Sequence, residues 1–382
     1  MMIELLFFLA LFLAVYPYLV YPLVLTALAR VTARPTVRRD WTPKVSILIP
    51  AYNEEAVIEK KIENTLALDY PTESVEVLIG SDGSDDGTVA KVEPYLERVI
   101  RLLPFSERRG KPSVISDLAA QSTGEILVLT DASAMLDRTA LRELISAFGS
   151  DDIGVVSGEM VPDSGKAMES SMGFYRRSDN RLRRLESAIH SSTGAAGAIY
   201  AIRRELFLTL PPDVILDDFV IPLRCVLRGY RVLICREGRF TEIDKVSLSG
   251  EFRRKVRTLA GNYQALRWLW PLLVPGRSPI WFQLLSHKYM RLWTPLWMLA
   301  LVPLNIALLP SPLFSAALAA QVAFYIAAGL GYWLRNSPRR VTLLHLPFLF
   351  LTMQVASAWA PLLLLTGRVS MRWTHERSFT HE

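Results

Sequence analysis

Cysteine is scarce in this chain of 382 residues. Only Cys225 and Cys235 are present, and their separation matches no metal-ligand spacing. Neither a thiolate zinc site nor a disulfide framework is therefore indicated. We expect both thiols to be reduced, as they are in cytoplasmic domains.

Repeats, low-complexity tracts and long structureless linkers are also lacking between the apolar ends of the chain. Without such breaks, residues 40–264 are predicted to form one soluble domain. The whole chain is 51% hydrophobic and 21% charged. The apolar residues concentrate at both ends, which is typical of a soluble domain held between membrane segments.

Positive charge is absent before the first apolar run, Ile3–Ala29. A secretory signal peptide begins with basic residues, so this run is predicted to be an uncleaved membrane anchor, residues 1–30. It is longer than the roughly 20 residues that span a bilayer. Basic residues follow it instead: Arg30, Arg34, Arg38, Arg39 and Lys44. The positive-inside rule then places the soluble domain in the cytoplasm and the N-terminus outside.

The net charge of +6 comes largely from residues next to the apolar ends. We therefore interpret the basic excess as membrane orientation and expect no nucleic-acid binding. The stretch Met168–His190 is an exception, because it carries arginines inside the soluble domain. It is either a solvated helix face or a basic helix that faces anionic headgroups or a sugar-phosphate. Its arginines are Arg176, Arg177, Arg181, Arg183 and Arg184.

Beyond Ala265, aromatic residues alternate with basic ones, and prolines 271, 275 and 279 exclude one long helix. Residues 265–292 are predicted to be amphipathic helices at the membrane interface. Residues 293–366 contain three apolar runs, at 294–309, 313–334 and 341–366. About three C-terminal transmembrane helices would place the tail, residues 367–382, outside, yet the tail is basic. One run is therefore interfacial or re-entrant, or the tail breaks the rule. We expect a multi-pass protein of the inner (cytoplasmic) membrane.

The soluble domain alternates strands and helices, which predicts an α/β fold with a mostly parallel sheet. The expected strands are Val45–Ile49, Val75–Ile79, Val99–Leu103, Glu125–Thr130, Gly154–Ser157, Ala198–Ile202 and Arg231–Cys235. The expected helices begin at Glu54 and cover Lys111–Gln121, Thr139–Phe148, Lys166–His190 and Asp217–Arg228. Ligands of open α/β sheets bind beyond the carboxyl ends of the strands.

Acidic and polar residues cluster at these strand ends or in nearby loops. The clusters contain Glu54, Asp82, Asp131, the pair Asp217 and Asp218, and the segment Arg108-Arg109-Gly110-Lys111. Carboxylates gathered with a lysine suit a divalent metal, Mg²⁺ or Mn²⁺, that is bound to a diphosphate. Each cluster is a weak signal alone, because an Asp in a polar loop often only caps a helix. Their order and spacing make the signal strong.

In order, the motifs are IPAYNEE, SDGSDDGT, GK, TDAS and DDF. This set resembles the family 2 inverting glycosyltransferases, which have the Rossmann-like GT-A fold. It is most similar to the membrane-embedded members: the cellulose, hyaluronan and poly-N-acetylglucosamine synthases and ceramide glucosyltransferase. The resemblance covers the soluble domain, and the arrangement of apolar segments agrees with it. It implies transfer of a sugar from a UDP-sugar to a lipid-linked or growing polysaccharide acceptor at the membrane. Partners in a polysaccharide export system are a further implication.

The resemblance also assigns roles to residues. Those implied to bind the nucleotide-sugar are Ala51, Tyr52, Glu54, Asp82, Lys111, Asp131 and Arg257. Asp131 and Ser133 occupy the metal-binding D-x-D positions. Asp218 matches the catalytic base, and Asp217 is its partner in the acidic pair. Gly194 and Gly197 lie in a small-residue loop, Thr193–Ala198, that resembles the loop under the acceptor, where small residues let a sugar approach the backbone.

This sequence departs from the family pattern at two places. Ser133 replaces the second Asp of D-x-D, and a hydroxyl is a weaker metal ligand than a carboxylate. The stretch Arg254–Thr258 stands at the position of the Q-x-x-R-W motif of processive members, and it retains only the arginine of that motif, as Arg257. In the family the missing tryptophan stacks under the acceptor, so its absence puts processive synthesis in doubt. Two alternatives stay open: a polyprenyl-phosphate glycosyltransferase, and a catalytically silent nucleotide-binding subunit of an export complex.

Overall fold

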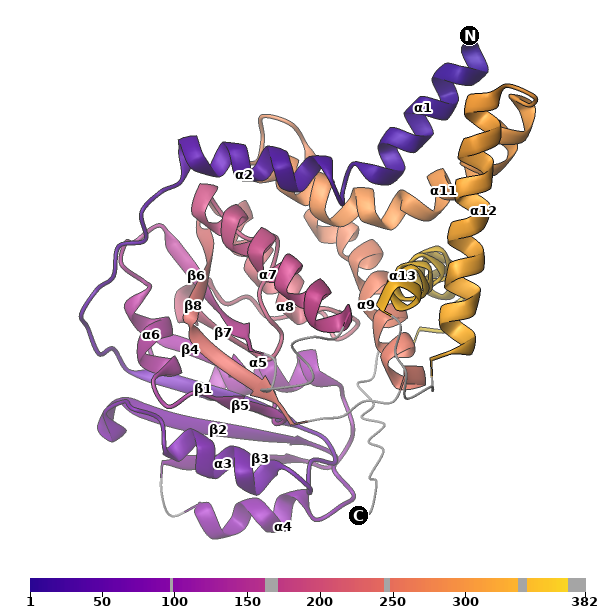
Figure 1. The fold of residues 1–382 in the computed structure, drawn as a ribbon. Helices are drawn as coiled ribbons and strands as arrows, with labels where there is room; N and C mark the ends of the chain where they lie inside the picture. Colours follow the sequence, from indigo (N-terminus) through magenta and orange to yellow (C-terminus); the bar gives the residue numbers. More distant parts are fainter. Residues whose placement is uncertain (97–98, 162–170, 244–247, 336–341, 370–382) are drawn as a thin grey trace.

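The structure is a computed structural model that describes residues 1–96, 99–161, 171–243, 248–335 and 342–369. In this part of the chain, eight strands form one mixed sheet (Figure 1). The strand order is β3-β2-β1-β4-β7-β6-β8-β5. Strands β3, β2, β1 and β4 are all parallel, which confirms the expected parallel sheet for this half. In the other half, β7 is antiparallel to both neighbours, β6 and β8 are parallel, and β5 is antiparallel to β8.

The seven expected strands are all present, and several extend further than the hydrophobic pattern indicates. Their bounds are β1 Val45–Ala51, β2 Val75–Asp82, β3 Ile100–Phe105, β4 Ile126–Thr130, β6 Ile153–Met160, β7 Ile199–Arg203 and β8 Arg231–Glu242. The three-residue strand β5, Ala134–Leu136, was not predicted. It pairs with the end of β8, and a strand this short gives no readable alternation.

Helices cover both faces of the sheet, and side chains alternate between the two faces along each strand. On β1, Ile47 and Ile49 pack in one core with α3 (Ile58–Leu66) and α6 (Ala140–Ser146). Leu48 packs in the other core with α5 (Lys111–Gln121) and α8 (Asp217–Leu227). Burial of both faces explains why these strands read as continuous apolar runs. The long helix α7 (Ser171–Ile189) also belongs to this domain, and the expected start of that helix lies outside the described residues.

The N-terminal apolar run, predicted to be a membrane anchor, is bent and does not form one straight helix. It forms α1 (Met2–Val15) and α2 (Val20–Thr32), bent by 60°. Pro17 lies in the break, where it lacks an amide hydrogen for a helical bond. Tyr21 and Leu25 of α2 pack on Leu182 of α7, so α2 rests on the soluble domain.

The C-terminal part begins with α9 (Leu248–Leu269), which runs without interruption through Ala265 where the composition changes. After it come the short turns η4 (Trp270–Leu273), α10 (Trp281–Gln283) and the π-helix η5 (Leu284–Tyr289). The prolines therefore prevent one long helix here, as expected. The chain continues in α11 (Met290–Ala307), α12 (Pro312–Trp333) and α13 (Thr342–Leu365). The remaining short elements are η1 Thr72–Ser74, α4 Thr88–Val92, η2 Glu93–Tyr95 and η3 Arg204–Leu206.

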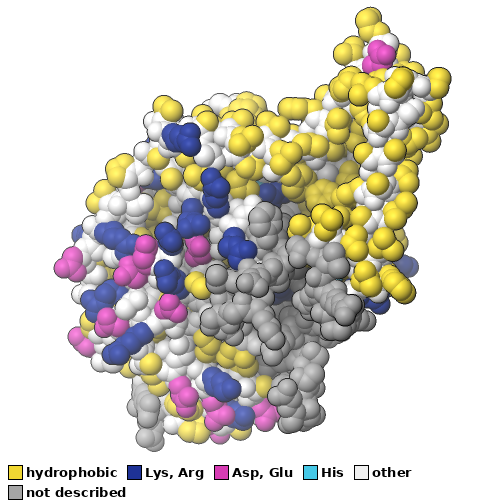
Figure 2. All heavy atoms as spheres, in the orientation of Figure 1, with side chains coloured by type: hydrophobic (Ala, Val, Ile, Leu, Met, Phe, Trp, Pro, Cys, Tyr) yellow, Lys and Arg dark blue, Asp and Glu magenta, His cyan; other side chains and the backbone are white. Residues whose placement is uncertain are grey.

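Two helices of the described chain are long and apolar enough to cross a membrane, Pro312–Trp333 and Leu343–Leu365, and the bent pair α1–α2 would be a third. Hydrophobic side chains cover the arm that α1 and α12 form, whereas charged side chains gather on the sheet domain (Figure 2). Phe8, Leu313 and Trp333 are 50%, 60% and 78% exposed. A soluble surface rarely carries so large an apolar area, so this arm suits contact with lipid. The basic tail beyond residue 369 and the loop 336–341 lie outside the described residues.

Candidate active site

The loops that follow β1 and β2 are bound to each other. The backbone N–H of Asn53 donates to Ser84 Oγ at 3.2 Å, and its side-chain amide donates to Asp85 Oδ1 at 2.6 Å. The N–H of Glu54 donates to Thr88 Oγ1 at 2.8 Å, and the Glu54 side chain is buried. The parallel pairing of β1 with β2 brings these two loops together, as the sequence predicted.

Ala51 and Tyr52, two of the residues predicted to bind the nucleotide-sugar, follow one another at the end of β1. Ala51 is buried and paired with Ser81 of β2. Tyr52 is half-buried, and the guanidinium carbon of Arg108 lies 3.7 Å from the centre of its ring. A planar aromatic–guanidinium stack is a surface on which a nucleobase can lie.

Asp82, at the end of β2, binds the loop that precedes α5. Its two carboxylate oxygens accept the backbone N–H groups of Arg109 and Gly110, at 2.7 and 2.8 Å. Gly110 has a φ of +92°, which an L side chain rarely adopts. Asp82 therefore fixes the start of α5 and with it the position of Lys111, the first residue of that helix.

Lys111 lies between two of the predicted acidic residues. Its Nζ is 2.8 Å from Asp131 Oδ1 and 3.4 Å from Asp217 Oδ2. Burial would lower the pKa of Lys111, but the charges of Asp131 and Asp217 outweigh it and raise the pKa. The ends of β4, α5 and α8 thus bring a cation and two carboxylates together, although Lys111, Asp131 and Asp217 are 20 to 106 residues apart in sequence.

Asp218 lies beside this group. Burial and the neighbouring charge of Asp217 raise the pKa of Asp218 to about 6, although Lys111 acts in the opposite direction. A carboxylate with a pKa near neutrality is suited to accept a proton at physiological pH. A Cβ at Gly197 would come within 2.9 Å of Asp218 Oδ2. The small-residue loop therefore makes room for the carboxylate of Asp218 itself.

Gly194, the other predicted acceptor residue, also lies in this loop. It has a φ of +128°, and a Cβ there would be 3.2 Å from the Phe219 ring. The next residue, Ala195, donates its N–H to the carbonyl of Asp218 at 2.9 Å. The loop is thus hydrogen-bonded to the first turn of α8, which carries the acidic pair.

Arg257 reaches the acidic group from α9. Its Nη2 donates to the carbonyl of Ile215 at 3.1 Å, and its Nε is buried with no hydrogen-bond partner among the described residues. Burial lowers the pKa of Arg257, against the opposing charges of Asp217, Asp218 and Asp131. A buried N–H without a partner is costly, so this group is suited to bind an anion.

The described residues contain no group of three or more His, Cys, Asp or Glu side chains that could enclose a metal ion. Mg²⁺ usually binds through one or two carboxylates together with substrate phosphates. The Asp131 carboxylate, whose ion pair among the described residues is with Lys111, fits this mode. Ser133 is buried two residues further on, with its carbonyl bound to the N–H of Ile243.

The sequence analysis missed Lys61, which lies beneath Asp131. It is fully buried, and its Nζ donates to Thr130 Oγ1 at 2.9 Å and to the carbonyl of Ala134 at 2.6 Å. Burial lowers the pKa of Lys61 to about 7, although the charge of Asp131 acts against it. Lys61 shares the helix face of the apolar residues Ile58 and Ile62. A lysine at a core position of an amphipathic helix was the available signal.

We expect Lys61→Met to destabilise the protein and to impair the site. The Ala134 carbonyl would lose its partner, which costs about 1–3 kcal/mol for a buried group. The segment Thr130–Ala134, which carries Asp131 and Ser133, would lose its support from α3. Thermal unfolding and donor binding of the variant measure the two effects. Lys60→Met is the matched control, because that side chain is exposed on the same helix. An unchanged melting temperature for Lys61→Met would contradict this role.

Comparison with known proteins gives the family of this domain. Residues 46–209 match the family model described as "Glycosyl transferase family 2". Among curated relatives, poly-beta-1,6-N-acetyl-D-glucosamine synthase of Staphylococcus aureus (strain COL) is 24% identical over 273 residues, 68% of this chain and 65% of the relative. A probable glycosyltransferase, YdaM of Bacillus subtilis (strain 168), is 25% identical over 63% of this chain and 61% of its own length. The matches thus span about two thirds of these relatives.

A solved structure shares the fold over nearly the whole chain. The mannosyltransferase PcManGT from Pyrobaculum calidifontis, in complex with GDP-Man and Mn²⁺, superimposes with a TM-score of 0.72 and is 23% identical. The superposition covers 94% of this chain and 99% of that protein. The chain thus contains a glycosyltransferase family 2 domain at residues 46–209 and shares the GT-A fold of this neighbour.

Proposed function

We propose that this protein transfers a sugar from a UDP-sugar to a lipid-linked or growing polysaccharide acceptor at the cytoplasmic face of the membrane, with inversion at the anomeric carbon. The proposal rests on the position of Asp218. This carboxyl lies next to the Lys111–Asp131–Asp217 group, and its pKa is raised to about 6. A proton acceptor directly beside a cluster suited to a diphosphate is the arrangement that glycosyl transfer needs.

In this proposal the donor is held by the loops at the strand ends. Ala51, Tyr52, Glu54 and Asp82 contact the nucleoside. Lys111 and Arg257 bind the diphosphate, since both are cationic and Arg257 Nε lacks a partner among the described residues. Mg²⁺ or Mn²⁺, held by Asp131 and Ser133, would stabilise the negative charge on the departing diphosphate when bound.

The chemical step then uses Asp218 as the general base. The Asp218 carboxylate accepts the proton of an acceptor hydroxyl as that oxygen attacks the anomeric carbon. The bond from this carbon to the diphosphate oxygen breaks, and Lys111 and Arg257 stabilise the charge of the leaving UDP. Because attack and departure occur on opposite faces, the configuration inverts. Asp217 orients Lys111 through their ion pair.

The membrane assignment rests on the apolar helices. We propose a multi-pass protein of the inner membrane, with α12, α13 and the α1–α2 pair as its membrane segments and 265–292 at the interface. The bend between α1 and α2 and the contact of α2 with α7 support an interfacial position for α2. The acceptor would then reach Asp218 from the membrane surface.

The decisive experiment measures nucleotide release by the purified full-length chain in detergent against a panel of UDP-sugars. One UDP-sugar is expected to release UDP, and release is expected to rise when membrane lipids are added. GDP-mannose belongs in the panel, because it is the donor in the PcManGT complex. If only GDP-mannose releases its nucleotide, the donor of this protein is a GDP-sugar and not a UDP-sugar. No release from any donor would favour the catalytically silent subunit, the alternative that Ser133 and Thr258 motivate.

A further inference from the structure

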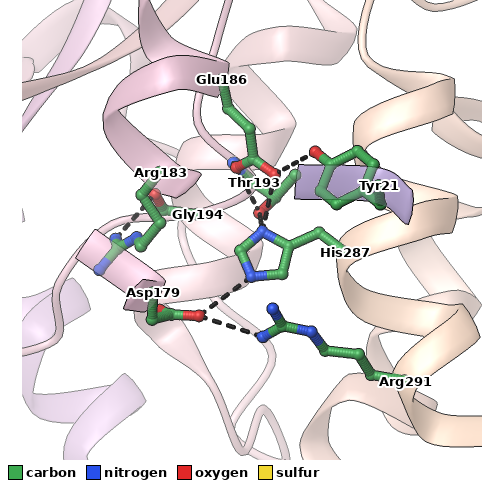
Figure 3. Close-up of polar contacts among 8 residues, drawn as sticks. All are labelled: Tyr21, Asp179, Arg183, Glu186, Thr193, Gly194, His287 and Arg291. Atoms are coloured by element: carbon green, nitrogen blue, oxygen red, sulfur yellow. Dashed lines mark hydrogen bonds and ion pairs between the residues drawn. The ribbon is translucent and has the colours of Figure 1, made fainter. Parts of the chain in front are cut away.

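The arginines of α7 differ in their surroundings. Arg181 is exposed, and Arg184 pairs with Glu159 at 3.6 Å. Arg183 is half-buried, and its Nη2 donates to the carbonyl of Gly194 at 3.1 Å (Figure 3). No carboxylate lies within ion-pair distance of Arg183 in the described part of the chain. Among the described residues its charge therefore lies at the small-residue loop without an ion pair, close enough to Asp218 to act against the raised pKa of that carboxyl.

Lys288, on η5, is a second cation of this kind. It is half-buried, and its Nζ lies 5.8 Å from the centre of the Phe219 ring. Within residues 1–96, 99–161, 171–243, 248–335 and 342–369, Lys288 has neither a hydrogen bond nor an ion pair through its side chain. Burial and the neighbouring charge of Arg183 lower the pKa of Lys288, while Asp179 and Glu186 act in the opposite direction.

The two nearby carboxylates are already occupied by other groups (Figure 3). His287 lies between them, with Nδ1 2.7 Å from Glu186 Oε1 and Nε2 3.0 Å from Asp179 Oδ1. Both ring nitrogens face carboxylate oxygens, so the ring occupies one oxygen of each carboxylate. Arg291 adds a second contact to Asp179 at 3.2 Å, and Tyr21 donates to Glu186 at 2.6 Å.

This occupied network leaves an excess of positive charge. His287 contacts both Asp179 and Glu186, and Arg291 forms an ion pair with Asp179. Burial would raise the pKa of each of these two carboxyls, but the hydrogen bond and charge of His287 hold both pKa values below their usual range. Both carboxylates therefore stay ionised and paired. Arg183 and Lys288 remain as two adjacent cations, and an anion between them would relieve their mutual repulsion.

The position of these two cations connects the catalytic base with the membrane-facing segment. Arg183 binds the backbone of Gly194, Lys288 lies by the Phe219 ring, and Phe219 follows Asp218 directly. Glu186 also accepts the N–H and hydroxyl of Thr193, at 3.3 and 3.1 Å, which fixes the same loop. Lys288 comes from the aromatic and basic stretch at 265–292 that is expected at the membrane interface.

We propose that Arg183 and Lys288 bind the phosphate of a lipid-phosphate acceptor, and that this contact places a hydroxyl of the sugar attached to it at Asp218. The proposal rests on the proposed function and names its acceptor class. Arginine binds phosphate through its planar fork and lysine as a point charge. The donor diphosphate is assigned to Lys111 and Arg257. Inversion places the acceptor on the opposite face of the sugar, so a phosphate on the acceptor would bind at a site other than that of the donor diphosphate.

The test measures binding of farnesyl phosphate and of farnesol to the full-length protein in a neutral detergent. Farnesyl phosphate is expected to bind at least about tenfold more tightly, the effect of one or two charged hydrogen bonds. Lys288→Gln and Arg183→Gln should each reduce the ratio of the affinity for farnesyl phosphate to that for farnesol about tenfold. Because Lys288 makes no hydrogen bond among the described residues, its variant tests the charge with little effect on folding. Arg181→Gln is the matched control and should keep the preference.

Three outcomes would overturn the proposal. The first is equal binding of farnesyl phosphate and farnesol, and the second is a preference for farnesyl phosphate that both variants retain. The third is displacement of farnesyl phosphate by phosphatidylglycerol at equal affinity, which would make the site a general headgroup anchor. UDP binding by each variant, expected to be unchanged, reports correct folding. Nucleotide release is measured separately, so failure of the proposed function would leave the farnesyl phosphate result interpretable.

Discussion

Asp218→Asn is expected to reduce sugar transfer about 10³-fold while leaving the affinity for UDP within about twofold, since a general base contributes roughly 10²–10⁴ in rate. Asparagine has nearly the same size and fills the same space beside Gly197, where the fit is close. It cannot accept the proton of the acceptor hydroxyl. Transfer measured as product formation, and UDP binding measured by calorimetry, separate the two effects.

The pH dependence of the unmodified protein tests the same assignment. The pKa of Asp218 is raised to about 6, and only its deprotonated form can act as a base. Transfer should therefore be full above about pH 7 and fall as the pH decreases through about 6. Asp213→Asn is the matched control for Asp218→Asn and should keep the activity and pH dependence of the unmodified protein. Asp213 is 38% exposed, and among the described residues its side chain pairs only with the surface residue Arg267.

A mild effect of Asp218→Asn would remove Asp218 from the role of base. It would favour the polyprenyl-phosphate alternative, in which the ionised phosphate oxygen of the acceptor is itself the nucleophile and needs little proton removal. Loss of UDP binding together with transfer would instead place Asp218 in donor binding. Each of these results is distinguishable from the expected one.

Lys111→Met is expected to reduce transfer about 10²–10³-fold, the usual effect of removing one group that stabilises transition-state charge. It should also weaken donor binding at least tenfold, because the cation assigned to the diphosphate is lost. The structure predicts a further consequence. Without Lys111, the charges of Asp131 and Asp217 are no longer neutralised at 2.8 and 3.4 Å, so the pKa of Asp218 should rise above 6.

The residual transfer of Lys111→Met should therefore lose activity at a higher pH than the unmodified protein does. The acid limb of its pH–rate profile measures this shift. Lys91→Met is the control, because Lys91 forms an ion pair with Glu59 at the surface, 3.2 Å away. If Lys111→Met lowers the rate without moving the acid limb, the electrostatic coupling between Lys111 and Asp218 is absent.

The strands and most helices of the soluble domain could be read from the sequence. Strands buried on both faces give unbroken apolar runs, and Lys111–Gln121 was predicted with the bounds that the structure gives. Strand β5 and the buried Lys61 were not found. A three-residue strand has no periodicity, and a lone lysine reads as a surface residue unless its helix face is examined.

The membrane segments show a different limit. Hydropathy locates apolar runs, but it does not say whether a run is one helix or two. The run at Ile3–Ala29 bends by 60°, and Tyr21 in its second half packs on α7 and binds Glu186. Only contacts with a distant segment decide that α2 rests on the sheet domain.

By itself, the sequence determined the reaction family, the order of strands along the chain and the polar residues that end each strand. These features are local, because a motif and an apolar run each occupy a few consecutive residues. The tertiary structure decided which of these residues meet. Lys111, Asp131 and Asp217 come together because the chain folds β4, α5 and α8 to one edge of the sheet. Arg183 and Lys288 lie more than 100 residues apart in sequence, and only packing of η5 on the domain makes them neighbours.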